Sequence, residues 1–364
     1  MLRYGLVFAL LFVSGCTSQI DFGQNEIQVA TPVLEEASDI VAIKNIDTIP
    51  NSPVLPDDTV DLSFIIENLD KTEPLSRLKV DLFDAASFKD SQSTTLCNTA
   101  TTAAVCKPEG QTAPCAGNKC DLVNLSPGAQ RLVNYNLKAP SSNDILKLST
   151  DFELRFAVEH YFTANSIYRP VVVNPVEIKA LQRAGQKVDL QAASTLGSGP
   201  VKIDLSLVNR NFILNKRGAT FEAVVRHTGS GRLLSNKIEH GALTITFVGI
   251  PCNKFDGISA GGYDDAFTFK DDSVNSLSSC VFTNNAERDV KDSAGQVTGK
   301  KSIGAIDIYS EGKSNPLLFR LNDDATAAID IGVAPYRSYE VRATAGYTYR
   351  VSGVARVTVK PLEI

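Results

Sequence analysis

Tryptophan is missing from the 364-residue chain, methionine occurs once, and histidine occurs three times, at His160, His227 and His240. The sequence also lacks a G-x-S-x-G elbow, an H-E-x-x-H zinc motif, a phosphate-binding loop, a dinucleotide fingerprint and a C-x-x-C-H haem motif. We therefore predict no catalytic residues and no cofactor. His160 is interpreted as a strand-end or surface residue, and the other two histidines as turn residues.

Long runs of one kind are also missing. No long basic run occurs, and the net charge is -5, which argues against a nucleic-acid partner because phosphate binding requires clustered Lys and Arg. The apolar run at residues 4–13 is shorter than the roughly 20 residues that a bilayer span requires. The run follows a basic start at Arg3 and therefore fits the hydrophobic core of a secretory signal.

The end of this run, Val13-Ser14-Gly15-Cys16, places two small residues before a cysteine. This arrangement resembles the lipobox of lipoprotein signal peptides. The resemblance implies that residues 1–15 are a signal peptide and that Cys16 becomes the lipid-bearing first residue of the mature protein. An ordinary secretory signal with an incidental cysteine is the alternative. We expect a protein that is lipid-anchored to the membrane and faces the periplasm or the cell exterior, with residues 16–37 as a flexible stalk.

Six further cysteines are present, and an even number outside the cytoplasm predicts disulfides. They are Cys97, Cys106, Cys115, Cys120, Cys252 and Cys280. The favoured pairs within the upstream cluster are Cys97–Cys106 and Cys115–Cys120. A nested pairing of the same four cysteines and a four-cysteine zinc site are the alternatives. The two downstream cysteines are expected to pair with each other.

Hydrophobic residues alternate with polar ones in many short segments, which is the period of a half-buried strand. The expected strands are 40–43, 59–68, 78–82, 131–138, 152–162, 168–173, 188–190, 201–207, 220–226, 243–248, 303–309, 317–321, 339–345 and 347–359. Helical periodicity is not apparent. The pattern predicts an all-β fold of two tandem β-sandwich domains, and the resemblance described below implies that they are immunoglobulin-like.

The first domain is expected at residues 38–180 and the second at 181–364, with a boundary in the polar stretch 174–187. The first contains a cysteine-rich insertion at residues 87–127, and the second contains an insertion between Cys252 and Cys280. Long insertions of this kind in a compact domain are usually functional or disordered.

Two turns resemble those of CARDB-type immunoglobulin-like modules, which are common in bacterial and archaeal surface proteins. They are Glu67-Asn68-Leu69-Asp70 and Thr228-Gly229-Ser230-Gly231-Arg232. Tyr347-Thr348-Tyr349 is similar to the closing hairpin of such modules. The resemblance implies surface adhesion or a scaffold role and supplies no catalytic residues. The cysteine-rich insertion departs from the simple module.

Binding residues are expected on loops and strand edges, because β-sandwiches usually recognise partners there. Acidic pairs on loops could bind calcium, although no D-x-D-x-D-G loop occurs and solvated turns are the simpler interpretation. Tyrosines in or near strands are interpreted mainly as packing residues. We expect a non-catalytic binding, adhesion or scaffold role toward an envelope or extracellular protein or glycan. A substrate-binding or hydrolytic envelope lipoprotein is the alternative.

Overall fold

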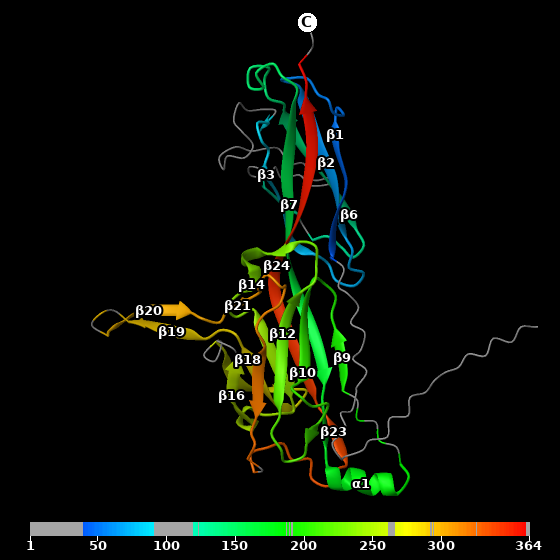
Figure 1. Cartoon of the computed structure of the whole chain (residues 1–364), viewed down its shortest axis with the longest axis vertical. Coiled ribbons are helices and arrows are strands. Elements are labelled where there is room, and N and C mark those ends of the chain that lie inside the picture. Colours follow the sequence, from blue (N-terminus) through cyan, green and yellow to red (C-terminus); the bar gives the residue numbers. More distant parts are fainter. Residues whose placement is uncertain are drawn as a thin grey trace, which may run out of the picture. The chain divides into compact units, whose positions relative to one another are not determined.

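The computed structural model of the chain describes residues 39–90, 119–122, 124–186, 188, 190, 192–260, 266–291, 293, 295–324 and 326–361 (Figure 1). All of them belong to one compact unit that spans Leu34–Ile364. Within these ranges, nearly all regular structure is β-strand, and most strand pairs are antiparallel. The prediction of an all-β fold is confirmed.

The first sandwich packs a four-stranded sheet against one part of a nine-stranded sheet. The four strands are, in sheet order, β1 (Val41–Ile49), β2 (Thr59–Asn68), β6 (Gln130–Lys138) and β4 (Lys89–Asp90). The facing strands are β5 (Lys119–Leu122), β3 (Ser76–Asp84), β7 (Thr150–Arg169) and β24 (Glu340–Val359). Phe64 of β2 stacks on Phe156 of β7 with ring centroids 4.0 Å apart, which places the core between the two sheets.

The second sandwich uses the rest of the nine-stranded sheet. Its strands beside β24 are β15 (Leu243–Val248), β18 (Leu277–Thr283) and β17 (Thr268–Val274). The facing sheet contains β10 (Val201–Leu207), β12 (Thr220–His227), β22 (Leu317–Leu321) and β16 (Phe255–Ala260). Phe247 of β15 lies at the centre of this core and contacts Phe221, Phe282 and Phe319.

Shorter elements complete the described fold. They are β8 (Val171–Val173), α1 (Pro175–Arg183), β9 (Ala193–Leu196), β11 (Ile213–Leu214), β13 (Arg232–Leu233), η1 (Leu234–Asn236), β14 (Lys237–Ile238), η2 (Cys252–Lys254), β19 (Glu287–Lys291), β20 (Val297–Ser302), β21 (Ile306–Asp307) and β23 (Tyr336–Ser338). The strand expected at 303–309 is therefore reduced to the two residues of β21.

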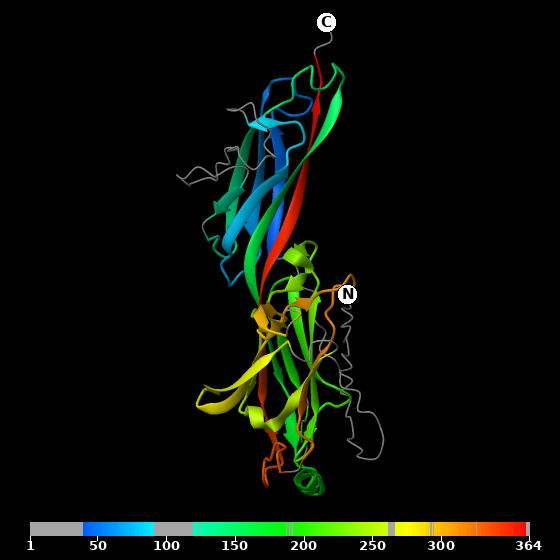
Figure 2. The same cartoon turned by 90° about the vertical axis from the view of Figure 1, so that its left-hand side faces the viewer.

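Strands β7 and β24 are each 20 residues long and pair with each other from one sandwich into the other (Figures 1 and 2). The sequence predicted two strands in each segment, with Tyr347-Thr348-Tyr349 in a hairpin, and both expectations are wrong. Gly353 does not break β24. An added Cβ there would lie 2.5 Å from the Phe156 ring, so the position requires a glycine for packing.

Strand pairing crosses the expected domain boundary. The last part of β24 pairs with the first part of β7 in the first sandwich, where Val359 lies opposite Thr150. Val359 also forms a parallel bridge with Val54. The C-terminal strand therefore contributes to both sandwiches. Whether residues 38–180 and 181–364 fold as separate domains stays a prediction.

A short helix, α1, occupies the expected boundary, so the expectation that no helix occurs is wrong. Asn174 caps it by accepting a hydrogen bond from the Val176 backbone N–H at 3.2 Å, and Pro175 takes the first helical position. Asn followed by Pro is a common helix start. The first N–H groups of a helix have no partner within the helix, so a proline at the first helical position loses no hydrogen bond. The sequence therefore contained this signal.

The two sandwiches are joined by hydrogen bonds as well as by the long strands. Asp39 accepts hydrogen bonds from the Tyr349 hydroxyl at 2.6 Å and from the Ser230 N–H at 3.0 Å. The Ser198 hydroxyl donates to Asp70 at 2.6 Å. Asp70 and Ser230 lie in the two turns that resemble CARDB-type modules, so both turns take part in this junction.

Cys252 and Cys280 form the predicted disulfide, with Cα atoms 4.6 Å apart. Cys16, Cys97, Cys106 and Cys115 lie outside the described residues, and of Cys120 only the backbone is described, in β5. The upstream pairing and the zinc alternative therefore stay predictions.

Because β7 and β24 belong to both cores, we expect the sandwiches to unfold together. Phe156→Ala in the first core and Phe319→Ala in the second should each cost about 3–5 kcal/mol and lower the same single thermal transition. Scanning calorimetry of the two variants measures this. Two transitions, of which each variant shifts only one, would instead support two independently folding domains.

Candidate functional site

A polar pocket of about 420 Å³ lies in the second sandwich, where ends of several strands meet. Its lining residues are Val208, Asn209, Arg210, Gly218, Ala219, Thr220, Asp256, Arg320, Leu321 and Asp323. The volume falls within the range of small-molecule sites. The lining holds no histidine or cysteine, so it offers no obvious nucleophile with a base.

Backbone hydrogen bonds fix the walls of this pocket. The Val208 N–H donates to the Thr220 carbonyl at 2.9 Å, and the Leu321 N–H donates to the Ala219 carbonyl at 2.8 Å. The segment before β12 is thereby held between the end of β10 and the end of β22. A Cβ at Gly218 would lie 2.9 Å from the Leu321 carbonyl oxygen and would also displace the Asp323 carboxylate, so this close approach of backbone favours glycine.

Two guanidinium groups and two carboxylates line the pocket, from Arg210, Arg320, Asp256 and Asp323. No ion pair joins any two of these four described side chains, whereas Arg226 and Asp204, farther along β12 and β10, pair at 2.6 Å. Arg210 makes one long hydrogen bond, 3.4 Å, to the Gly218 carbonyl. The pocket therefore presents charges of both signs to a ligand, which suits a small zwitterion or a polyhydroxylated molecule.

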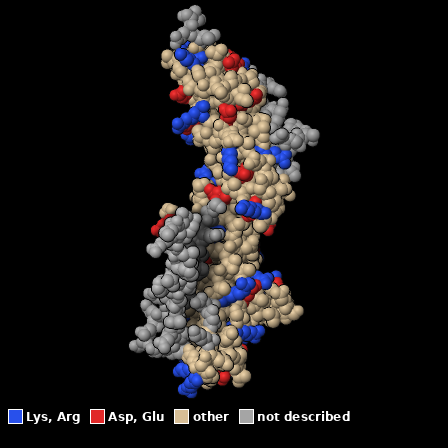
Figure 3. All heavy atoms as spheres, turned by 90° about the vertical axis from the view of Figure 1, so that its right-hand side faces the viewer, with Lys and Arg blue, Asp and Glu red and all other residues tan. Residues whose placement is uncertain are grey.

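Outside the pocket, charges of both signs are interspersed. Figure 3 shows Lys and Arg side chains scattered among Asp and Glu on one face of the protein. Ion pairs at the protein surface include Arg169 with Glu340 at 3.1 Å and Arg155 with Glu153 at 2.9 Å. Pairs of this kind contribute little to stability.

His160 lies in the middle of β7 and is fully buried, so its interpretation as a strand-end or surface residue is wrong. Its ring packs edge-on against Tyr349 with centroids 5.6 Å apart, and neither ring nitrogen has a hydrogen-bond partner among the described residues. Burial lowers the pKa of His160 to about 4, and the negative charge of Asp39 offsets only part of this shift. His160 is a neutral core residue at pH 7.

The other two histidines do not form a site with His160. His227 ends β12, and its ring lies 5.6 Å from that of Tyr349. Partial burial lowers the pKa of His227, against the opposing charge of Asp39. His240 lies in the turn between β14 and β15, as predicted. Among the described residues, no group of three or more His, Cys, Asp or Glu could hold a metal ion.

The acidic pairs serve local structure where they are described. Asp271 accepts a hydrogen bond from the Cys252 N–H at 2.8 Å, and Asp324 accepts one from the Thr326 N–H at 2.9 Å. Asp57 pairs with Lys138 at 3.4 Å. Asp264 and Asp265 lie outside the described residues. Calcium binding at these pairs stays an untested alternative.

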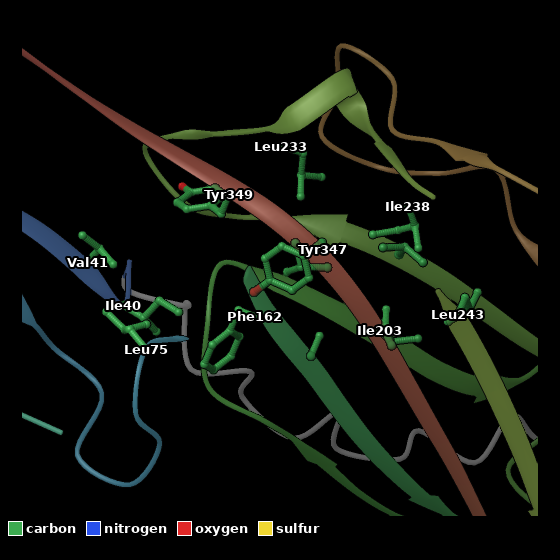
Figure 4. Packing of buried hydrophobic residues seen from close by; sticks show 14 of the residues in the cluster. Ile40, Val41, Leu75, Phe162, Ile203, Leu233, Ile238, Leu243, Tyr347 and Tyr349 are labelled. Carbon is green, nitrogen blue, oxygen red and sulfur yellow. The ribbon is translucent and has the colours of Figure 1, made fainter. Parts of the chain in front are cut away.

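The tyrosines divide into two groups. Among the described residues, five are buried, in agreement with a packing role, namely Tyr135, Tyr168, Tyr339, Tyr347 and Tyr349. Three are exposed, namely Tyr161, Tyr309 and Tyr336. Figure 4 shows Tyr347 and Tyr349 on β24, between Ile40, Val41 and Leu75 on one side and Leu233, Ile238 and Leu243 on the other.

Comparisons with known proteins give little guidance. No family model matches the chain, and no curated protein matches it in sequence. Among solved structures, the partial N-terminal region of an enterococcal surface protein aligns with 93% of this chain and 88% of its own. The identity is 10% and the TM-score is 0.15, so this alignment carries no argument about function. In the described residues, no helix has the length and apolar character of a membrane span.

The burial of His160 predicts a pH dependence of stability. Its pKa is about 4 in the folded protein and about 6.5 when unfolded, so the unfolded chain binds more protons between these values. Stability should therefore fall with decreasing pH in this window, with His160 contributing a loss of about 2 kcal/mol between pH 7 and pH 5.

His160→Phe keeps an aromatic ring against Tyr349 and removes the titrating group. Urea unfolding of both proteins at pH 7 and pH 5 measures the difference. His227 is present in both proteins, so its contribution cancels. An equal loss of stability in the wild type and the variant would contradict the assignment to His160.

Proposed function

We propose that this protein is a non-catalytic binding or scaffold protein of the cell envelope, anchored by lipid on Cys16. The proposal has two parts. The anchor rests on the sequence of the first 16 residues, where a basic start, a short apolar run and small residues precede a cysteine. The binding role rests on the architecture of the described residues.

The observation that supports a binding or scaffold role best is the continuous β7–β24 pair, which runs through both cores. A frame of this kind holds loops and strand ends in fixed positions, and β-sandwiches usually recognise partners through such segments. A partner is expected among envelope or extracellular proteins or glycans. A recognition role for the insertion at residues 87–127 also stays a proposal, because most of it lies outside the described residues.

Capture of a small solute is the second candidate function, and the pocket favours it. Arg210, Arg320, Asp256 and Asp323 line one cavity without pairing with one another. In a protein without a bound ligand, four such groups would remain solvated. A solute with both a cationic and an anionic or hydroxyl group could replace that solvent with charge-assisted hydrogen bonds.

Lipidation of Cys16 is tested by labelling cells with a fatty-acid probe. The wild-type protein should take up label and remain with the membrane fraction, and Cys16→Ser should lose both properties because no thiol remains to be acylated. Ser18→Ala is the matched control, since it changes a neighbouring polar residue and should keep the label. Equal labelling of Cys16→Ser and wild type would contradict the anchor.

Solute binding is tested by calorimetric titration with glutamate, lysine, glycine betaine, glucosamine and glucuronate. If one of these binds, Arg320→Gln and Asp256→Asn should each weaken it roughly 10-fold or more, because each removes a charged hydrogen-bond partner. Arg356→Gln, whose side chain is 82% exposed and is not part of the pocket lining, is the control. Binding that is unaffected by both pocket variants would exclude this pocket as the site.

A further inference from the structure

The hairpin of β19 and β20, residues 287–302, is hereafter the arm. Among the described strands, β19 and β20 pair only with each other, and every described residue in them is exposed. Figure 1 shows the arm extending away from the second sandwich. An isolated two-stranded hairpin is marginally stable in water, because it has no hydrophobic face to bury. The arm therefore has the properties of a segment that is stabilised by a partner.

The side chains of the arm indicate the chemistry of that partner. Arg288 and Lys301 lie directly opposite each other in the hairpin. Lys300 pairs with Glu287 at 3.4 Å in an exposed ion pair. The two strands still carry an excess of positive charge, because Arg288, Lys291, Lys300 and Lys301 outnumber Glu287 and Asp289. Val297 is 56% exposed. A suitable partner strand would carry carboxylates and one apolar side chain.

Strand β17 of the same chain has these features. It is the outermost strand of the nine-stranded sheet, so one of its edges has no neighbour among the described strands. Asp271 and Asp272 lie in its middle, and Phe269 is 59% exposed. Asp271 also accepts the hydrogen bond from the Cys252 N–H, and Asp272 lies 3.9 Å from Lys270 in an exposed ion pair of the kind that contributes little and can be exchanged for another partner. Residues Thr268–Ser273 of β17 are all exposed. Charged residues protect an edge from indiscriminate pairing, and they also select a strand of opposite charge.

We propose that the arm of one copy of this chain pairs along the β17 edge of a second copy. Backbone hydrogen bonds would extend the nine-stranded sheet, and the lysines of β20 would face the carboxylates of β17. The interface is heterologous, since the arm and the edge are different surfaces. Each copy keeps one of them available, so the assembly grows as a chain of copies. The alternative outcome is that the arm binds another protein or a glycan instead of a second copy of this chain.

The proposal goes beyond the proposed function and does not depend on Cys16. The segment 34–364 contains every described strand and therefore serves as the soluble form. Sedimentation velocity over a range of concentrations at low salt should detect association of this form. The association should weaken with added salt because it depends on exposed charges.

Charge reversal provides the decisive comparison. Lys300→Glu with Lys301→Glu reverses the arm, and Asp272→Lys reverses the edge, and each should weaken association at least tenfold. A mixture of these two variants should associate again, because each reversed surface then meets a complementary one. Lys71→Glu with Lys147→Glu, two exposed lysines of the first sandwich, matches the charge change of the arm variant and should leave association unchanged.

Circular dichroism of each variant confirms folding before association is compared. Three results would overturn the proposal. One is a monomer at every concentration up to the solubility limit. Another is association that only one of the two reversals weakens. The third is an arm that captures a different molecule while the protein stays monomeric. None of these results bears on the lipid anchor, which fatty-acid labelling tests separately.

Discussion

The pairing of β7 with β24 is the constraint on which the rest of the described structure depends. Each strand has 20 residues, and their register is continuous from Val341 opposite Tyr168 to Val359 opposite Thr150. One part of this pair packs under Phe64 in the first sandwich, and the other part forms the sheet beside β15 in the second. A shift of register by one residue would turn the buried side chains of both cores toward solvent.

The junction between the sandwiches combines this pairing with a small number of polar contacts. Burial tends to raise the pKa of Asp39, but hydrogen bonds from Ser230 and Tyr349 outweigh it and lower the pKa overall. Burial also opposes ionisation of Asp70, yet hydrogen bonds from Ser198, Glu73 and Thr72 lower its pKa to about 2. Both carboxylates are therefore ionised at neutral pH, as their hydrogen bonds require. Burial keeps His160 neutral although the charge of Asp39 favours its protonated form.

Much of the fold could be predicted from the sequence, and the errors have physical causes. The alternation of hydrophobic and polar residues predicted the positions of β2 and β10 well, because one face of each strand is buried along its whole length. It divided β7 because the buried positions between Phe162 and Tyr168 are Ala164 and Ser166, which are too small or too polar to give a hydrophobic signal. It divided β24 at Gly346, which carries no side chain. The Cys252–Cys280 disulfide could be predicted because these two cysteines lie far along the chain from the four upstream ones. The pocket could not be predicted, because its charged residues come from separate strand ends and loops and share no motif.

The distance along the chain between β7 and β24 also affects how the protein can form during synthesis. Thr150 at the start of β7 pairs with Val359 at the end of β24. The nine-stranded sheet therefore cannot form completely in either sandwich until β24 has been synthesised. Contacts between residues so distant in sequence form slowly, because the intervening chain must lose conformational freedom first. In the meantime the edge of β7 is exposed to other chains. Formation of the β7–β24 pair is therefore the step that removes this open edge.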